Sequence, residues 1–193
     1  MQTRFSDVFP PKPGRAHEVT GAGAIAFAAM ACGLSGKPII WLSENWASEV
    51  LNPSGLTPFC DPRLMLLGCC TSSVDLMACA EEALRSGAVP MVIAEISKPL
   101  TLIAGRRLQL AAKAGNATGI FIIPDGMGSN AAETRWQCSP IFDAEDSTLQ
   151  RWELIKNKSG TLGNWKVRWN ADARRVTVVS QNAERPHSAR SLR

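Results

Sequence analysis

The sequence predicts an α/β fold with a mostly parallel central sheet, helices on its faces, and an antiparallel extension of the sheet at the C-terminal end. Two observations support this prediction. Between residues 16 and 123, short apolar runs without alternation, typical of strands buried on both faces, alternate with helical segments. After residue 133, strand-like segments follow one another with only turn residues between them.

The first two thirds of the chain predict the parallel part of the sheet. Residues 16–20 form a short strand stopped by Gly21-Ala22-Gly23, and residues 24–34 form an alanine-rich helix that is apolar all round and therefore buried. Another helix begins after an N-cap at Ser72 or Ser73 and ends at Gly87. Such alternation implies parallel strands joined by right-handed crossovers. The other expected elements are strands at 38–43, 63–69, 89–96 and 118–123 and a helix at 101–114.

The last third predicts a meander of mostly antiparallel strands, at 133–139, 151–157, 165–169 and 175–180. Basic residues such as Arg135 are interleaved there with Trp136, Trp152, Trp165 and Trp169. Basic and aromatic side chains in alternation can bind single-stranded nucleic acid. Alternating tryptophans on a sheet more often pack in a core, and we favour that interpretation.

Length and charge predict one domain, 16–180, preceded by a loosely packed N-terminal arm, 1–15, and followed by a disordered basic tail, 181–193. The arm holds three of the twelve prolines. Arg185, Arg190 and Arg193 lie in the tail, so residues 1–184 hold 18 basic and 17 acidic side chains. A body this close to neutral argues against a plain DNA-binding module, because duplex affinity depends on neutralising phosphates.

Several further classes of protein are disfavoured. No apolar run reaches the length of a membrane span and the N-terminus has no secretory signal, so we expect a cytoplasmic protein. The six cysteines form no Cys-x-x-Cys pair and the only histidines are His17 and His187, whereas a zinc site needs four converging ligands. Without a Gly-x-Ser-x-Gly motif, a Ser-His-Asp hydrolase is not expected either. We therefore expect no metal and no cofactor, and most cysteines as small buried hydrophobes.

Where a phosphate-binding loop would follow the first strand, the sequence lacks the residues such a loop needs. The motif G-x-x-x-x-G-K-[ST] supplies a lysine for the phosphates and a hydroxyl for magnesium, but Gly21-Ala22-Gly23 is followed by neither. Glu44 and Glu95 do fall at the carboxyl ends of predicted strands, where ligands bind in open α/β sheets. They suit a magnesium-organising acid and a water-activating base. Without a phosphate loop, we favour a role in capping loops or helix ends.

Three basic residues lie in the helix predicted at 101–114. Arg106, Arg107 and Lys113 are candidates for contact with a partner or with DNA. A solvated helix face is the more ordinary interpretation of such residues, and the sequence does not separate the two.

Several segments resemble RecA proteins. The stretch EEALRSGAVPMVIAEI resembles the RecA helix that runs into the Walker B strand, and PIIWLSEN resembles the strand that carries the RecA catalytic glutamate. HEVTGAG resembles the strand that leads into the RecA phosphate loop, but the loop itself is missing from this sequence. The resemblance places Gly21, Gly23, Glu44 and Glu95 at vestigial nucleotide-site positions and implies no catalytic residue.

A closer resemblance is to the ImuA family, the RecA-like proteins of inducible mutagenesis operons. It rests on HEVTG, GRRLQLAAKAG, ETRWQC and RWELIKNKSGTLGNWKVRWN. The resemblance implies a non-catalytic accessory protein of the SOS-type DNA damage response, an adaptor for error-prone translesion DNA synthesis. Implied partners are an ImuB-type Y-family polymerase relative, RecA and, indirectly, an error-prone DnaE-type polymerase, with at most weak contact to DNA.

Two alternatives stay open. The chain could be a divergent RecA-type ATPase that acts on DNA through Glu44 and Glu95. It could also be a SulA-like inhibitor of cell division, another RecA-derived protein without a nucleotide site. Under the adaptor interpretation, the tail that carries Arg185, Arg190 and Arg193 is a candidate for binding a partner.

Overall fold

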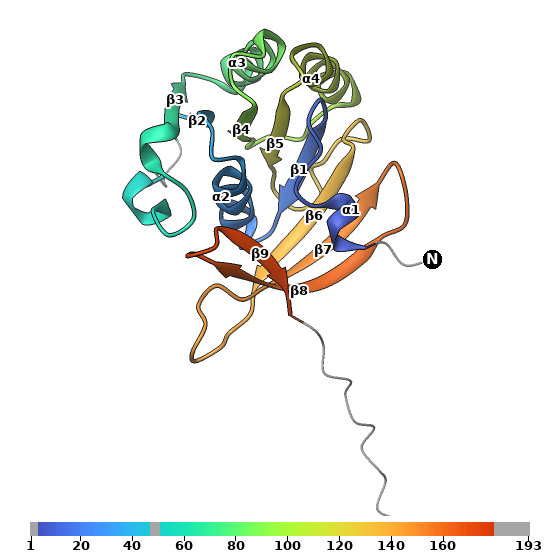
Figure 1. The fold of residues 1–193 in the computed structure, drawn as a ribbon. Coiled ribbons are helices and arrows are strands. Elements are labelled where there is room, and N and C mark those ends of the chain that lie inside the picture. The colour runs from blue at the N-terminus through green and yellow to red at the C-terminus, as the bar shows by residue number, and fades with distance from the viewer. Residues whose placement is uncertain (1–3, 47–50, 180–193) are drawn as a thin grey trace, which may run out of the picture.

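A computed structural model describes residues 4–46 and 51–179 of the chain. The predicted tail, with Arg185, Arg190 and Arg193, lies outside the described residues. Within them the strands form one sheet, in the order β3-β2-β4-β5-β1-β6-β7-β8-β9 (Figure 1). In chain order the strands are β1 (Ala16–Thr20), β2 (Ile39–Glu44), β3 (Met65–Cys70), β4 (Met91–Glu95), β5 (Thr118–Ile122), β6 (Thr134–Pro140), β7 (Gln150–Asn157), β8 (Gly163–Asn170) and β9 (Arg175–Val178).

The helices of the described residues lie on both faces of this sheet (Figure 1). α2 (Ala24–Ser35) covers one face together with the short α1 (Phe5–Val8), whereas α3 (Ser73–Ser86) and α4 (Leu102–Gly115) cover the other. Two 3-10 turns, Pro53–Leu56 and Pro62–Leu64, lie in the connection between β2 and β3. The predicted buried helix is confirmed, because α2 is buried at every position from Phe27 to Gly33.

The sheet is parallel from β3 to β6 and antiparallel from β6 to β9, as the sequence predicts. β6 belongs to both parts. It pairs in parallel with β1, where His17 lies opposite Thr134, and antiparallel with β7, where Cys138 lies opposite Trp152. β1 therefore sits near the middle of the sheet between β5 and β6, and its five residues are all buried.

α3 and α4 end in ways that let them pack closely. Ser72 caps α3 by accepting a hydrogen bond from the backbone N–H of Asp75, and Gly87 ends it in the left-handed conformation at φ 64°. A Cβ added at Gly115 of α4 would lie 1.9 Å from the carbonyl oxygen of Leu84 in α3. Glycine at that position is what permits the C-terminal turns of the two helices to touch.

The segment before β1 is not the loosely packed arm that its prolines indicate. Val8 and Phe9 are 7% and 5% exposed. The ring of Phe9 lies 5.4 Å from that of Phe27 in α2 and 4.8 Å from that of Trp152 in β7, measured between centroids. Two phenylalanines within five residues supply enough apolar surface to hold the segment over the space between α2 and the antiparallel strands.

The tryptophans of the antiparallel part confirm the core interpretation. Trp136 and Trp152 are fully buried and Trp169 is 4% exposed. Trp165 is partly buried and packs against Phe5, with 5.5 Å between ring centroids. Stacking of nucleic acid bases on the three buried rings is thereby excluded.

Four of the six cysteines, Cys32, Cys60, Cys70 and Cys138, are buried, whereas Cys69 and Cys79 are exposed. The described residues contain no helix that is long and apolar enough to cross a membrane.

Candidate functional site

The residues at the vestigial positions come together at one edge of the sheet, where the parallel strands end. Gly21 and Gly23 follow β1, while Glu44 and Glu95 are the last residues of the neighbouring strands β2 and β4. Thr20 closes β1 with a hydrogen bond of 2.5 Å from its hydroxyl to Asp125, in the segment that follows β5. This edge is where ligands bind in open α/β sheets.

The turn between β1 and α2 is packed against β6. The N–H of Gly23 donates to the carbonyl oxygen of Cys138 at 2.9 Å, and the N–H of Ala24 donates to Gly21 at 3.0 Å. A Cβ at Gly21 would lie 2.4 Å from the Cys138 oxygen, and one at Gly23 would lie 2.7 Å from Oε1 of Gln150. Here the two glycines permit close approach to a neighbouring strand, and two of the amide groups that could face a phosphate are bonded to protein carbonyls.

The two carboxylates differ in their surroundings. Oε1 of Glu95 accepts a hydrogen bond of 2.6 Å from the indole N–H of the buried Trp41. Glu44 is 5% exposed, and its Oε1 has no hydrogen-bond partner within the described residues. The role that the sequence favours for both, capping a loop or a helix end, stays a prediction.

Replacing each glutamate by glutamine should therefore shift stability in opposite directions. Glu44→Gln removes a buried charge that lacks a bond at Oε1, and we expect it to raise the free energy of unfolding by about 1 kcal/mol. Glu95→Gln weakens a charge-assisted hydrogen bond from Trp41 and should lower the same quantity by about 1 kcal/mol. Urea unfolding of both variants checks the signs, and a loss of stability in Glu44→Gln would contradict the first expectation.

A buried ion pair in β1 organises the segment that follows β5. Glu18 is 2% exposed, and its Oε2 accepts from Nε of Arg135 in β6 at 2.7 Å. Its Oε1 accepts from the N–H of Ser129 at 2.7 Å, and Nη2 of Arg135 donates to the Ser129 carbonyl at 2.9 Å. The guanidinium of Arg135 is thus bonded to Glu18 and Ser129 within the protein. The structure therefore corrects the prediction that Arg135 contacts DNA or a partner.

The segments after β4 and β5 are joined to each other. The N–H of Leu100 donates to the carbonyl of Met127 at 3.0 Å, and the Ser129 hydroxyl donates to the carbonyl of Thr101 at 3.3 Å. Lys156 and Lys158 of the β7 end donate to the carbonyls of Ala132 and Ala131, the second at 2.6 Å. Burial, and then the neighbouring Lys158 and Arg135, hold the pKa of Lys156 below its usual value. Segment 124–133 is therefore held in place along its length.

The cations of α4 lie on its exposed face. Nη2 of Arg107 lies 2.7 Å from Oε2 of Glu81 in α3, which also pairs with Arg85. Arg106 and Lys113 are exposed and form no ion pair with any described residue. Among the candidate contacts in the described part of the chain, these two are exposed and carry no ion pair.

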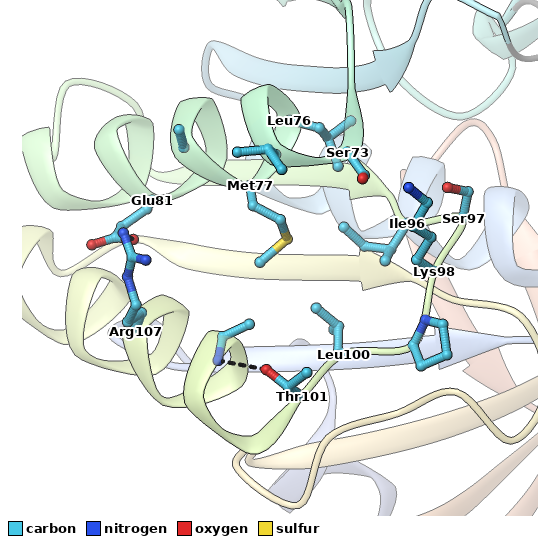
Figure 2. A pocket seen from close by; sticks show the side chains of 14 residues that line it. Ser73, Leu76, Met77, Glu81, Ile96, Ser97, Lys98, Leu100, Thr101 and Arg107 are labelled. Atoms are coloured by element: carbon cyan, nitrogen blue, oxygen red, sulfur yellow. Dashed lines mark hydrogen bonds and ion pairs between the residues drawn. The ribbon is translucent and has the colours of Figure 1, made fainter.

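A pocket of about 330 Å³ lies between α3 and α4, beside the segment that follows β4 (Figure 2). We call it the α3–α4 groove. Figure 2 shows Met77 extending from α3 into the gap, with Leu100 across from it and the pair Glu81 and Arg107 at one end. The sequence does not reveal this groove, because it depends on the spacing between two packed helices.

His17 is buried in β1 and is neutral at ordinary pH. Its Nε2 lies 3.0 Å from the carbonyl oxygen of Lys12, which can only accept, so Nε2 carries the hydrogen. Its Nδ1 then accepts from the Thr134 hydroxyl at 2.7 Å. The pKa of His17 is lowered to about 4, chiefly by burial; the Lys12 carbonyl opposes this shift, and the positive charges of Arg15 and Lys12 contribute to it.

This histidine predicts a loss of stability in acid. The unfolded chain takes up the proton near pH 6.5 and the folded protein only near pH 4, so stability falls through that window and is unaffected above it. The full loss is about 3 kcal/mol. Urea unfolding at several pH values should show a weaker pH dependence in His17→Gln than in the unchanged protein. The same substitution at His187 serves as the control, and an equal dependence in His17→Gln would contradict the assignment.

Comparisons with known proteins bear on the fold. No protein-family model matches the sequence, and no curated protein is significantly similar to it. The structure is similar to that of the RadB recombinase, with a TM-score of 0.63 and 15% sequence identity, over 88% of this chain and 92% of that chain. At this identity the likeness concerns the fold alone. The chain therefore has a RecA-like fold, with a mostly parallel central sheet, flanking helices and antiparallel C-terminal strands.

Proposed function

We propose that this chain is a RecA-like accessory protein that acts in DNA damage tolerance as an adaptor for error-prone translesion synthesis and does not hydrolyse ATP. The proposal combines the RecA-like fold with the resemblance of the sequence to the ImuA family. Its partners would be an ImuB-type Y-family polymerase relative and RecA, with an error-prone DnaE-type polymerase engaged indirectly.

The observation that carries the proposal is the packing of the β1–α2 turn. In a working nucleotide site this turn wraps the phosphates, a lysine neutralises them and a hydroxyl holds magnesium. Here Gly21 and Gly23 lie against Cys138, and the Gly23 amide already donates to its carbonyl. Opening the turn for a triphosphate would require α2 to separate from β6, which supports a protein that works without bound ATP.

The alternative of a divergent ATPase has one observation in its favour. Glu44 and Glu95 end adjacent strands at the same edge of the sheet, as a magnesium-organising acid and a water-activating base would. A phosphate loop of unrecognised sequence would then be needed beside them.

Calorimetric titration of the full chain with ATP and magnesium separates these two functions. We expect no saturable heat. Saturable binding that disappears in Glu95→Gln would overturn the proposal and make the protein an ATPase.

Capture of the purified ImuB-type protein and of RecA by the immobilised chain tests the adaptor role directly. The reversal of Arg106 and Lys113 to glutamate should reduce capture about tenfold if the exposed face of α4 is the contact. The matched control reverses Arg151 and Arg175, two exposed cations of the antiparallel strands. Failure to capture either partner would remove the adaptor role, whereas unchanged capture after the α4 reversal would move the contact to another surface. Deleting residues 181–193 tests the tail in the same assay.

A further inference from the structure

One aromatic side chain is almost completely exposed to solvent. Phe142 is 95% exposed, more than any other large hydrophobic side chain of the described residues. It lies in the segment between β6 and β7, residues 141–149, which we call the β6–β7 loop. Exposing a whole phenylalanine ring to water is unfavourable, so a surface that covers it would be bound with a gain in free energy.

The loop that carries Phe142 is held in shape by its own bonds. The N–H of Ile141 donates to the carbonyl of Leu149 at 2.9 Å and closes its base. Oδ1 of Asp143 accepts from the N–H groups of Glu145 and Asp146 at 3.0 and 3.1 Å, and Asp146 pairs with Arg168. The ring is therefore presented by an ordered loop, which lowers the entropy lost when it binds a surface.

The chemistry of this loop matches that of the α3–α4 groove. The groove has an apolar lining of Leu76, Met77, Ile96, Leu100 and Ala104, and its volume of about 330 Å³ exceeds what one aromatic side chain fills. The thioether of Met77 also suits contact with an aromatic ring.

The charges of the α3–α4 groove and of the β6–β7 loop are complementary as well. The charged side chains that line the groove are Lys98, Arg107 and Glu81, two cations and one carboxylate, and Lys98 forms no ion pair with any described residue. Next to Phe142, Asp143 and Glu145 are exposed acidic side chains.

We propose that the α3–α4 groove binds the β6–β7 loop of a second copy of this chain, with Phe142 as the apolar anchor and Asp143 and Glu145 facing Lys98. The loop cannot reach the groove of its own chain, because Figure 1 places it at the lower left, far from α3 and α4 at the top. Each molecule offers a loop at one end and a groove at the other, so the contact is head-to-tail. Such a contact leaves a free loop and a free groove on every assembly and extends into chains unless it closes into a ring.

Sedimentation of the full chain across a wide range of concentration tests the contact. We expect the mean mass to rise continuously with concentration. Phe142→Ala should raise the dissociation constant by at least about tenfold. Leu162→Ala, which removes another exposed side chain at 56% exposure, is the matched control and should change nothing.

Mixing two defective variants identifies the two surfaces. Ala104→Trp fills the groove and leaves the loop intact, whereas Phe142→Ala does the reverse, so each should be monomeric alone. Their equimolar mixture restores one contact for each pair of molecules and should give dimers and nothing larger. Lys98→Glu is a second groove variant on an exposed side chain, with no packing to disturb, and should behave as Ala104→Trp does.

A chain that stays monomeric up to millimolar concentration would overturn the proposal. So would self-association that Phe142→Ala leaves unchanged, or a mixture that forms no dimers. Because none of these readouts involves nucleotide or a polymerase, the outcome is independent of the proposed function.

Discussion

Replacing Trp152 by alanine is expected to lower the free energy of unfolding by about 3–5 kcal/mol, the range for large aromatic truncations in a core. Trp152 is fully buried, and its ring lies 4.6 Å from that of Phe27 and 4.8 Å from that of Phe9. Its indole N–H donates to Oε1 of Gln150 at 2.7 Å, so the substitution also leaves a buried amide oxygen without this donor. It removes the ring shared by α2, the N-terminal segment and β7.

Urea unfolding followed by circular dichroism measures this loss. A domain of ordinary stability has about 5–15 kcal/mol in all, so the variant should unfold at much lower denaturant concentration or fold only in part. Trp46→Ala is the matched control, because Trp46 is 61% exposed and the same atoms are removed from the surface. Equal losses of unfolding free energy in Trp152→Ala and Trp46→Ala would contradict the conclusion that Trp152 is central to the core.

Replacing Glu18 by alanine should cost about 3 kcal/mol and release segment 124–133. The substitution leaves the guanidinium of Arg135, whose side chain is 20% exposed, without its counter-charge, and the N–H of Ser129 without its acceptor. Removing one member of a buried pair is costly because the other charge stays buried. Hydrogen exchange should accelerate at amides of residues 124–133 more than in α2, since that segment depends on the pair directly.

The paired substitution tells whether the cost lies in the orphaned charge. Glu18→Leu combined with Arg135→Met replaces both ions by apolar groups of similar size and should be much less destabilising than Glu18→Ala alone. Asp7→Asn, which breaks an exposed ion pair with Arg4, is the control and should change the unfolding midpoint little. If the double variant is as unstable as the single one, the ion pair is not the source of the loss.

The parallel strands could be predicted from the sequence because burial on both faces leaves a direct signature, a short continuous apolar run. The strand predicted at 38–43 is observed as Ile39–Glu44, and the strand predicted at 118–123 is observed as Thr118–Ile122. Glycine signals likewise placed the end of α3 at Gly87. The antiparallel strands were found from their turns, but the parallel pairing of β6 with β1 has no local signal.

What the sequence could not reveal depends on residues that are distant along the chain. α1 spans only four residues, too few for a helical period, and its neighbour Phe9 is buried by partners far along the sequence. Glu18 resembles an ordinary polar residue of a short strand, and its partner Arg135 lies 117 residues away. The sequence identified the edge of the sheet at which the four vestigial positions lie. It did not predict that Gly21 and Gly23 face a neighbouring strand, because that depends on where β6 lies.

The central position of β1 has a consequence for how the protein is made. Both of its neighbours are synthesised long after it, since Ala16 pairs with Gly119 and the partner of His17, Thr134, follows 117 residues later. While the ribosome extends the chain, the backbone of this strand has no hydrogen-bonded neighbour on either side. Contacts of such long range are slow to form, and an unpaired strand in a nascent chain is prone to aggregate. The central strand of the sheet can therefore be paired on both sides only after β6 has been synthesised.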